Sequence, residues 1–251
     1  MKKYFILPWL MLCMVASAQQ KINQTHSTAG INEIKMVFKY PEFIKITTWK
    51  RQEISITGEA MINRGEHNDA FKLEVLKDDG ILSISSIIEN LSDLPNRIMI
   101  SRDGEKYYFP TDDFQDPKVQ EFLKNADKKY DYQMHGVIKE IQLEIKVPNS
   151  IVLDIVAKYG LVELKNIMAP VTVEAKYGGI DMTLPASANK KLTARTKYGE
   201  IFSDLELNVD SELSESGTYH KWTNIVALLN QGGPKCYLES KYGNVYIRSA
   251  K

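Results

Sequence analysis

The tripeptide Lys-Tyr-Gly occurs four times in the second half of this 251-residue chain, and it constrains the fold more than any other feature. The glycines of successive copies are 18, 21 and 44 residues apart, and 44 equals two steps of 22 with one copy degraded. A period near 20 residues is typical of repeat architectures. The copies are Lys158-Tyr159-Gly160, Lys176-Tyr177-Gly178, Lys197-Tyr198-Gly199 and Lys241-Tyr242-Gly243.

Apolar or small residues alternate with other residues on both sides of each copy. In the first copy, Leu153, Ile155 and Ala157 precede Tyr159 by even steps. Such alternation predicts half-buried strands, and a glycine between two strands predicts a corner with positive φ or a close backbone approach. This parity places the tyrosines with the inward residues, inside the corner or leaning over it, and directs the lysines outward.

Strand, corner and strand, repeated every 18 to 22 residues, predict an all-β fold. The specific expectation is a single-chain β-solenoid of the right-handed β-helix type, because stacked coils share a core that no single coil can bury. Four outward residues stand two positions before the lysines, and alternation of sign among them is expected to offset repulsion between the lysines. They are Val156, Glu174, Arg195 and Glu239.

The N-terminus predicts export to the periplasm or the cell surface. Lys2 and Lys3 precede an apolar run that ends at Ala16-Ser17-Ala18, a pattern typical of a secretory signal peptide over residues 1–18. The alternatives are an uncleaved anchor, for which the run is short, and lipid attachment at Cys13. No later stretch is long and apolar enough to span a bilayer, so no transmembrane segment is expected after signal removal.

Charge and side-chain spacing exclude several function classes. Without residues 1–18 the chain keeps 30 basic and 32 acidic residues, a net charge of −2 that argues against a nucleic-acid partner. Cys236 is then the only cysteine, and its parity with Leu238 predicts a buried, inert thiol. The histidines lack metal-ligand spacing, and no nucleophile elbow or phosphate loop is present. We therefore expect no catalytic residue, cofactor or metal.

The remaining chain divides into a polar leader and one domain. Residues 19–33 predict a disordered leader, and residues 34–251 predict the solenoid domain. Residues 101–135 break the strand rhythm and predict one short helical insertion, with a helix from Pro117 to Lys129 that covers one face of the solenoid. Early strands are expected at 34–38, 43–48, 53–57, 71–76 and 81–87, with Ile44/Ile46 and Ile54/Ile56 as inward pairs.

Four segments carry a family resemblance. The run from Phe43 to Gly58 resembles the first repeat of a bacterial putative-adhesin family, which comprises exported proteins of the Bacteroidetes type with unknown function. The runs Leu229–Pro234 and Gly243–Ile247 are similar to its closing repeat, and the strand that ends at Asn149 also fits. The resemblance covers roughly residues 34–249 and implies an exported cell-envelope β-solenoid. The helical insertion and the Lys-Tyr pairs depart from the family pattern.

Two classes of function follow, with a third left open. The favoured one is a non-catalytic exported protein that presents a rigid surface for adhesion or for binding an envelope protein or a glycan. The alternative is a carbohydrate-active enzyme on a β-helix scaffold, whose carboxylates would converge in a groove. A periplasmic role in envelope-stress signalling stays open. A candidate contact strip, for which an ordinary solvated sheet face is the competing interpretation, comprises Glu163, Asp181, Phe202 and Tyr246.

Overall fold

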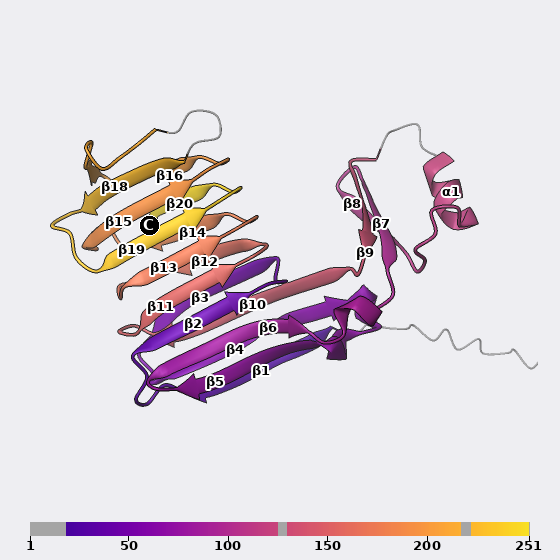
Figure 1. Ribbon diagram of the computed structural model, residues 1–251, viewed down its shortest axis with the longest axis horizontal. Helices are drawn as coiled ribbons and strands as arrows, with labels where there is room; N and C mark the ends of the chain where they lie inside the picture. Colours follow the sequence, from indigo (N-terminus) through magenta and orange to yellow (C-terminus); the bar gives the residue numbers. More distant parts are fainter. Residues whose placement is uncertain (1–18, 125–129, 217–221, 251) are drawn as a thin grey trace, which may run out of the picture.

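Two large β-sheets and a small third sheet, set apart from the other two, make up the computed structural model of the chain (Figure 1). The structure describes residues 19–124, 130–216 and 222–250. The expected signal peptide lies outside these residues. Within them the only α-helix is α1 (Pro117–Lys124), so the expected all-β class is confirmed.

The first large sheet has eight strands. From β10 through β3 to β16, each strand runs parallel to the next one in the sheet. At the other end, β4 pairs antiparallel with both β1 and β10. The order is β1 (Gln20–Ser27), β4 (Glu53–Ile62), β10 (Lys139–Pro148), β3 (Phe43–Trp49), β12 (Leu161–Lys165), β14 (Ile180–Leu184), β20 (Val245–Ser249) and β16 (Ile201–Ser203).

The second large sheet has nine strands and differs at one end from the first. Its middle is parallel, and antiparallel pairs close both ends. The order is β17 (Leu207–Val209), β18 (Thr223–Leu229), β15 (Lys190–Thr196), β19 (Lys235–Ser240), β13 (Val171–Ala175), β11 (Val152–Ala157), β2 (Glu33–Phe38), β6 (Ile81–Ile88) and β5 (Phe71–Asp78).

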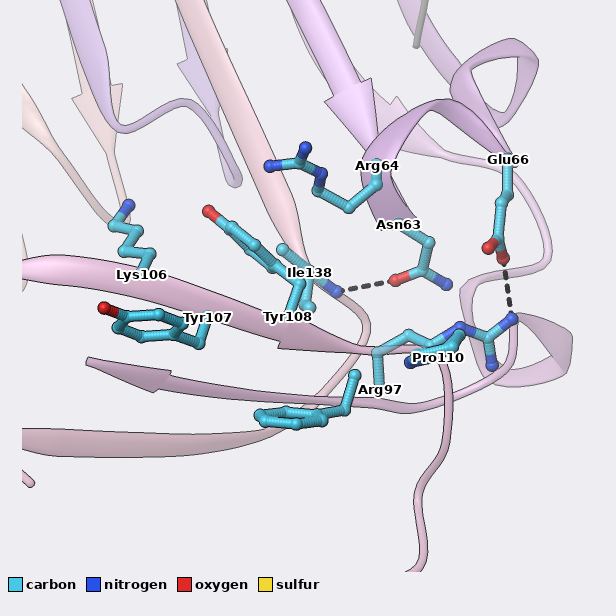
Figure 2. Close-up of a pocket in the computed structure, with 10 residues that line it drawn as sticks. Asn63, Arg64, Glu66, Arg97, Lys106, Tyr107, Tyr108, Pro110 and Ile138 are labelled. Atoms are coloured by element: carbon cyan, nitrogen blue, oxygen red, sulfur yellow. Dashed lines mark hydrogen bonds and ion pairs between the residues drawn. The ribbon is translucent and has the colours of Figure 1, made fainter. Parts of the chain in front are cut away.

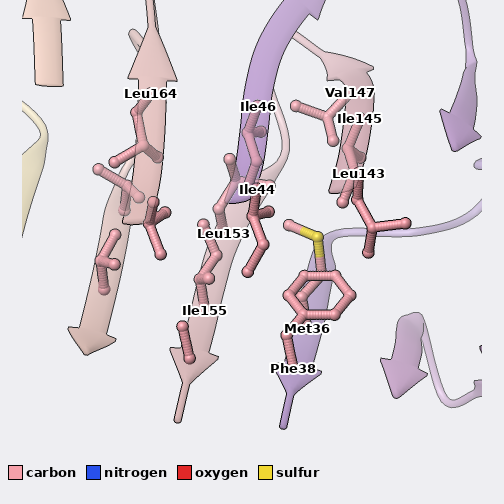
Figure 3. Packing of buried hydrophobic residues seen from close by; sticks show 14 of the residues in the cluster. Met36, Phe38, Ile44, Ile46, Leu143, Ile145, Val147, Leu153, Ile155 and Leu164 are labelled. Carbon is pink, nitrogen blue, oxygen red and sulfur yellow. The ribbon is translucent and has the colours of Figure 1, made fainter. Parts of the chain in front are cut away.

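One hydrophobic core fills the space between the two large sheets. Met36 and Phe38 of β2 lie opposite Leu143 of β10, and all three side chains are at most 1% exposed (Figure 3). The predicted inward pairs are confirmed, because Ile44, Ile46, Ile54 and Ile56 have no exposed surface. The alternation in the sequence therefore assigned these strand faces correctly.

Five units of strand, corner and strand stack across both sheets, but not in chain order. The spatial order is β2–β3, β11–β12, β13–β14, β19–β20 and β15–β16. The expectation of a degraded copy between Gly199 and Gly243 is wrong, because that segment forms β17 and β18 at the sheet end before the chain returns as β19. Both sheets are mixed and open, so the structure does not show the closed coils that the period predicts.

The helical insertion is mainly a β-structure. The third sheet joins β7 (Arg97–Arg102) to β8 (Glu105–Phe109) and β9 (Tyr132–Gly136), so strands continue where an interruption was expected. Helix α1 packs on this small sheet through Val119, against Ile98 and Ile100, rather than on a face of the two large sheets as expected. The helix begins at Pro117 as expected, and residues 125–129 of its expected end lie outside the described residues.

The polar leader also differs from expectation. Residues 20–27 form β1, which pairs along its full length with β4 in antiparallel register. Ile22 is its one buried apolar residue, at 8% exposure. The polar composition of this segment predicted disorder. The strand is instead stabilised by backbone hydrogen bonds to a neighbouring strand, and these do not depend on the polarity of its side chains.

Candidate functional site

The four Lys-Tyr-Gly corners meet in one column along the edge where the two large sheets join. Backbone bonds link them in the order 158, 176, 241 and 197: Lys176 N donates to Ala157 O, Lys241 N to Ala175 O and Tyr198 N to Lys241 O. A Cβ on Gly178 would lie 1.5 Å from Gly160 O, so the corner requires glycine for close approach. Positive φ, the other expected reason, applies at Gly160 but not at Gly178.

The tyrosines of these corners stack face to face. Ring centroids are 5.2 Å apart for Tyr159 and Tyr177, 5.2 Å for Tyr177 and Tyr242, and 4.9 Å for Tyr242 and Tyr198. The planes differ by only 11° to 14°. Each of the four tyrosine residues is 43% to 47% exposed. Of the two placements that parity allowed, inside the corner or leaning over it, the exposure excludes the first, and the column lies on the outside of the corner.

A lysine stands over each of these rings, at 5.1 to 5.4 Å from the ammonium nitrogen to the ring centroid. No carboxylate of the described residues lies within ion-pair distance of any of these four lysines. A cation over an aromatic face is attracted by the ring quadrupole. We call Lys158, Lys176, Lys241 and Lys197, with the tyrosines that follow them, the Lys–Tyr ladder.

The expected alternation of sign beside the ladder is wrong. Because β19 inserts next to β13, Glu174 lies directly beside Glu239 in the sheet. Glu239 accepts hydrogen bonds from Arg195 and Tyr237, at 3.0 and 2.5 Å. The lysines are therefore stabilised by their own tyrosine rings rather than by neighbouring carboxylates.

A groove of about 420 Å³ runs between the ladder lysines and the adjacent face of the second sheet. Val37 and Val156 form its apolar part, and Glu174 and Glu239 form its acidic part. Lys39 also lines the groove, together with Lys158, Lys176 and Lys241. The groove thus carries four cations and two carboxylates along one direction.

The column contains a fifth corner, at Lys39 and Tyr40, that was not predicted from the sequence. Lys39 and Tyr40 follow β2 as Lys158 and Tyr159 follow β11, and Lys158 N donates to Phe38 O. The repeated tripeptide does not extend to this corner, because Pro41 stands where the other corners have glycine. Tyr40 packs against the core instead of extending the exposed stack.

The candidate contact strip forms a continuous row on the first sheet. Glu163 pairs with Asp181 across β12 and β14, Asp181 with Tyr246 across β14 and β20, and Tyr246 with Phe202 across β20 and β16. The aromatic pair stacks with centroids 5.1 Å apart.

The carboxylates of this strip are already neutralised. Lys165 Nζ lies 2.5 Å from Glu163, and Arg248 Nε donates to both oxygens of Asp181 at 2.9 and 3.0 Å. The Arg248 guanidinium also lies 4.6 Å from the centre of the Tyr246 ring. The strip is therefore a surface network of paired charges, which leaves few groups free for a ligand.

Two further observations concern the described part of the chain. No three histidine, cysteine, aspartate or glutamate side chains gather there in a way that could hold a metal ion. In the same residues, no helix has the length and apolar character needed to cross a membrane.

Comparison with known proteins places the fold. No protein family and no curated protein matches the sequence. Among solved structures, the chain is similar to a putative cell adhesion protein from Clostridium sporogenes, with a TM-score of 0.50 and 11% identity over 93% of this chain and 100% of that one. A putative adhesin from Bacteroides fragilis gives a TM-score of 0.22 at 12% identity, over 93% and 99% of the two chains. The first likeness confirms the expected resemblance at the level of the fold.

Proposed function

We propose that this protein is a non-catalytic, exported cell-envelope protein that binds an extended acidic polysaccharide along the Lys–Tyr ladder. The observation that carries the proposal is the row of four lysines, which have no carboxylate partner in the described chain and stand on a rigid stack of tyrosines. The likeness to a putative cell adhesion protein agrees with a surface-binding role. We also propose that the five stacked units form an open β-solenoid, since their strands are in register in both sheets.

The spacing of the ladder favours a linear ligand. Neighbouring strands lie about 4.8 Å apart, so the ladder repeats positive charge at that interval. Like charges in a row repel one another, and a chain with a regularly repeated carboxylate relieves several of these repulsions at once. Because the corners are fixed by sheet hydrogen bonds, little conformational entropy is lost on contact.

The tyrosines favour polar contacts rather than sugar stacking. Within the ladder the faces of each inner ring are occupied by its stacked neighbours and by the lysine that precedes it, as for Tyr177 between Tyr159 and Tyr242. The exposed part of each tyrosine is therefore the ring edge and the hydroxyl group, and the hydroxyl can donate a hydrogen bond to a polymer or accept one from it. The lysines supply the charge, and the tyrosines hold them in line.

The carboxylates support the non-catalytic interpretation. Glycoside hydrolysis needs two carboxyl groups that flank one bond. Glu163 and Asp181 lie side by side on the sheet, but each is engaged by a cation of its own sheet. Glu174 and Glu239 lie in the lysine groove, where Arg195 and Tyr237 hold Glu239. Glu174 and Glu239 are direct neighbours on one sheet face, so they do not flank the groove from opposite sides as an acid and a base would.

The test is retention of the purified protein on immobilised polygalacturonate, with neutral dextran as the matched polymer, scored for both binding and chain cleavage. The triple variant Lys158→Gln, Lys176→Gln, Lys241→Gln should lose binding about tenfold, because three exposed pairs at roughly 0.5 kcal/mol each amount to that factor. Binding of the natural chain should also weaken as salt rises.

The matched control is the triple variant Lys72→Gln, Lys146→Gln, Lys191→Gln, which removes the same charge away from the ladder. This control should bind almost as well as the natural chain. Equal loss in both triple variants, or equal retention on dextran, would overturn the ladder as the binding surface. Cleavage of either polymer by the purified protein would overturn the non-catalytic interpretation.

A further inference from the structure

A second hollow of about 440 Å³ lies where the small third sheet joins the end of β4 and the start of β10 (Figure 2). Its volume is within the range of about 300–1,000 Å³ that is usual for small-molecule sites. Arg64, Arg97 and Lys106 supply three cations to its lining, whereas Glu66 supplies one carboxylate. The hollow is distinct from the ladder groove, with which it shares no lining residue.

The backbone at this hollow is strained. Asn63 and Arg64 adopt left-handed conformations, with φ of 47° and 61°, although neither is glycine. Such conformations cost energy in non-glycine residues and persist only where the surroundings enforce them, often at functional sites. The strain places the Arg64 side chain on the side of the hollow that Tyr108 occupies (Figure 2).

A buried asparagine holds this turn in place. The Asn63 side chain is only 1% exposed, and its Oδ1 accepts a hydrogen bond from Ile138 N at 2.9 Å. Its Nδ2 donates to Pro95 O at 2.8 Å, and its backbone N donates to Ile138 O at 2.9 Å. The turn is thus tied to β10 and to the segment that leads into β7, so Arg64 is presented by a rigid frame.

The cations differ in how far they are already engaged. Arg97 is bonded to Glu66 at 2.6 Å, and Lys106 lies 3.8 Å from Glu140. The guanidinium of Arg64 stands 4.5 Å from the centre of the Tyr108 ring and has no carboxylate partner in the described chain. The Tyr108 hydroxyl donates to Glu140, so Tyr108 is fixed as a platform under Arg64.

We propose that this hollow binds a small ligand through a carboxylate or phosphoryl group, held by Arg64 and Lys106. The guanidinium of arginine offers a planar fork of donors that matches either oxyanion, and a lysine ammonium adds a compact charge. Arg97 and Glu66 neutralise each other, and Lys106 lies 3.8 Å from Glu140, which is outside the lining, so Arg64 is the cation of the lining that has no carboxylate partner in the described chain. The site is independent of the ladder, so either can exist without the other.

The experiment measures binding to the full chain by calorimetry, with glucuronate, inorganic phosphate and neutral glucose as probes. We expect saturable binding of glucuronate or phosphate, but not of glucose. Whichever of the two anions binds more tightly shows whether the ligand is a sugar acid or a phosphoryl compound. Arg64→Gln and Lys106→Gln should each weaken the binding about tenfold or more. Arg51→Gln, at an exposed arginine outside the hollow, should leave it unchanged.

Arg64→Gly separates a binding role from a structural one. Glycine adopts the left-handed conformation of residue 64 without strain, so this variant should melt no lower than the natural chain while it loses the binding. If Arg64→Gly melts at a lower temperature than the natural chain, and the natural chain binds no anion, then Arg64 serves only to pack on Tyr108. Absence of saturable binding by both anions would overturn the proposal, as would equal loss in Arg51→Gln.

Discussion

Tyr242 stacks on Tyr177, with ring centroids 5.2 Å apart, although 65 residues separate the two in the chain. The contact arises because β19–β20 inserts between β13–β14 and β15–β16. Chain position would place Tyr242 at the end of the array, yet it has ring neighbours on both faces, Tyr177 and Tyr198. The ladder is therefore ordered by sheet pairing and not by sequence.

Truncation of a ladder tyrosine should cost stability according to its number of ring neighbours. Tyr177→Ala and Tyr242→Ala each remove two stacked pairs, whereas Tyr159→Ala removes one pair, that with Tyr177. At about 0.5–1.5 kcal/mol per pair, the first two variants should lose about 1–3 kcal/mol and the third about half as much. Urea unfolding measures this. Tyr→Phe at the same positions is the control, because it keeps the stacking. A much smaller loss for Tyr242→Ala than for Tyr177→Ala would contradict the observed order.

Gly178→Ala should destabilise the protein more than any exposed substitution. Its Cβ would lie 1.5 Å from Gly160 O and 2.3 Å from Gly160 C, both backbone atoms that cannot move aside without breaking the stack. We expect a loss above about 3 kcal/mol, or failure to fold. Gly104→Ala is the control: its φ of 80° adds backbone strain that Gly178→Ala lacks, but its Cβ would meet no atom within 4 Å. Comparable losses in the two variants would show that close approach is not what fixes the corner.

The Cys236 thiol should react only after unfolding. The residue has no exposed surface, and burial raises the pKa of the thiol from 9.0 to about 12. A thiol reagent at pH 8 should therefore label the denatured chain and spare the native one. Fast labelling of the native protein would place Cys236 on the wrong face of β19.

The same shift predicts a pH dependence of stability. Because the thiol binds its proton more tightly in the folded state, its contribution is present in full below pH 9 and is lost as the pH rises toward 12. The free energy of unfolding should fall over this range more steeply for the natural chain than for Cys236→Ala. Parallel curves for the two proteins would contradict the raised pKa.

Period-2 alternation predicted the local structure well, because it reports which side chains face a core. It found β2, β3, β5 and β6, and it assigned Cys236 to the buried face. It could not predict which strands lie side by side, because Val173 of β13 pairs equally well with any apolar strand in register. Its neighbours are Ile155 of β11 on one side and Leu238 of β19 on the other, and the sequence carries no mark of the second choice.

The candidate site was predictable only in part for the same reason. The Lys–Tyr ladder was visible as a repeated tripeptide, but its order and exposure depend on pairing between distant strands. The second hollow left no repeat at all: Arg64 follows β4, whereas Lys106 belongs to β8, and only the fold brings them together.

The third sheet should be dispensable for the fold of the two large sheets. Its strands pair only with one another, and Ile98, Ile100 and Val119 give it a small core of its own. Arg97 and Gly136, at its two ends, are direct partners across β7 and β9, so a two-residue Asn-Gly turn can join them after residues 98–135 are removed. The shortened chain should unfold cooperatively in urea and keep its β-sheet circular dichroism spectrum. It should also keep polygalacturonate binding, while anion binding at the second hollow disappears with Lys106 and Tyr108. An aggregated or non-cooperative product would show instead that contacts such as the Tyr108–Glu140 hydrogen bond hold the end of the large sheets together.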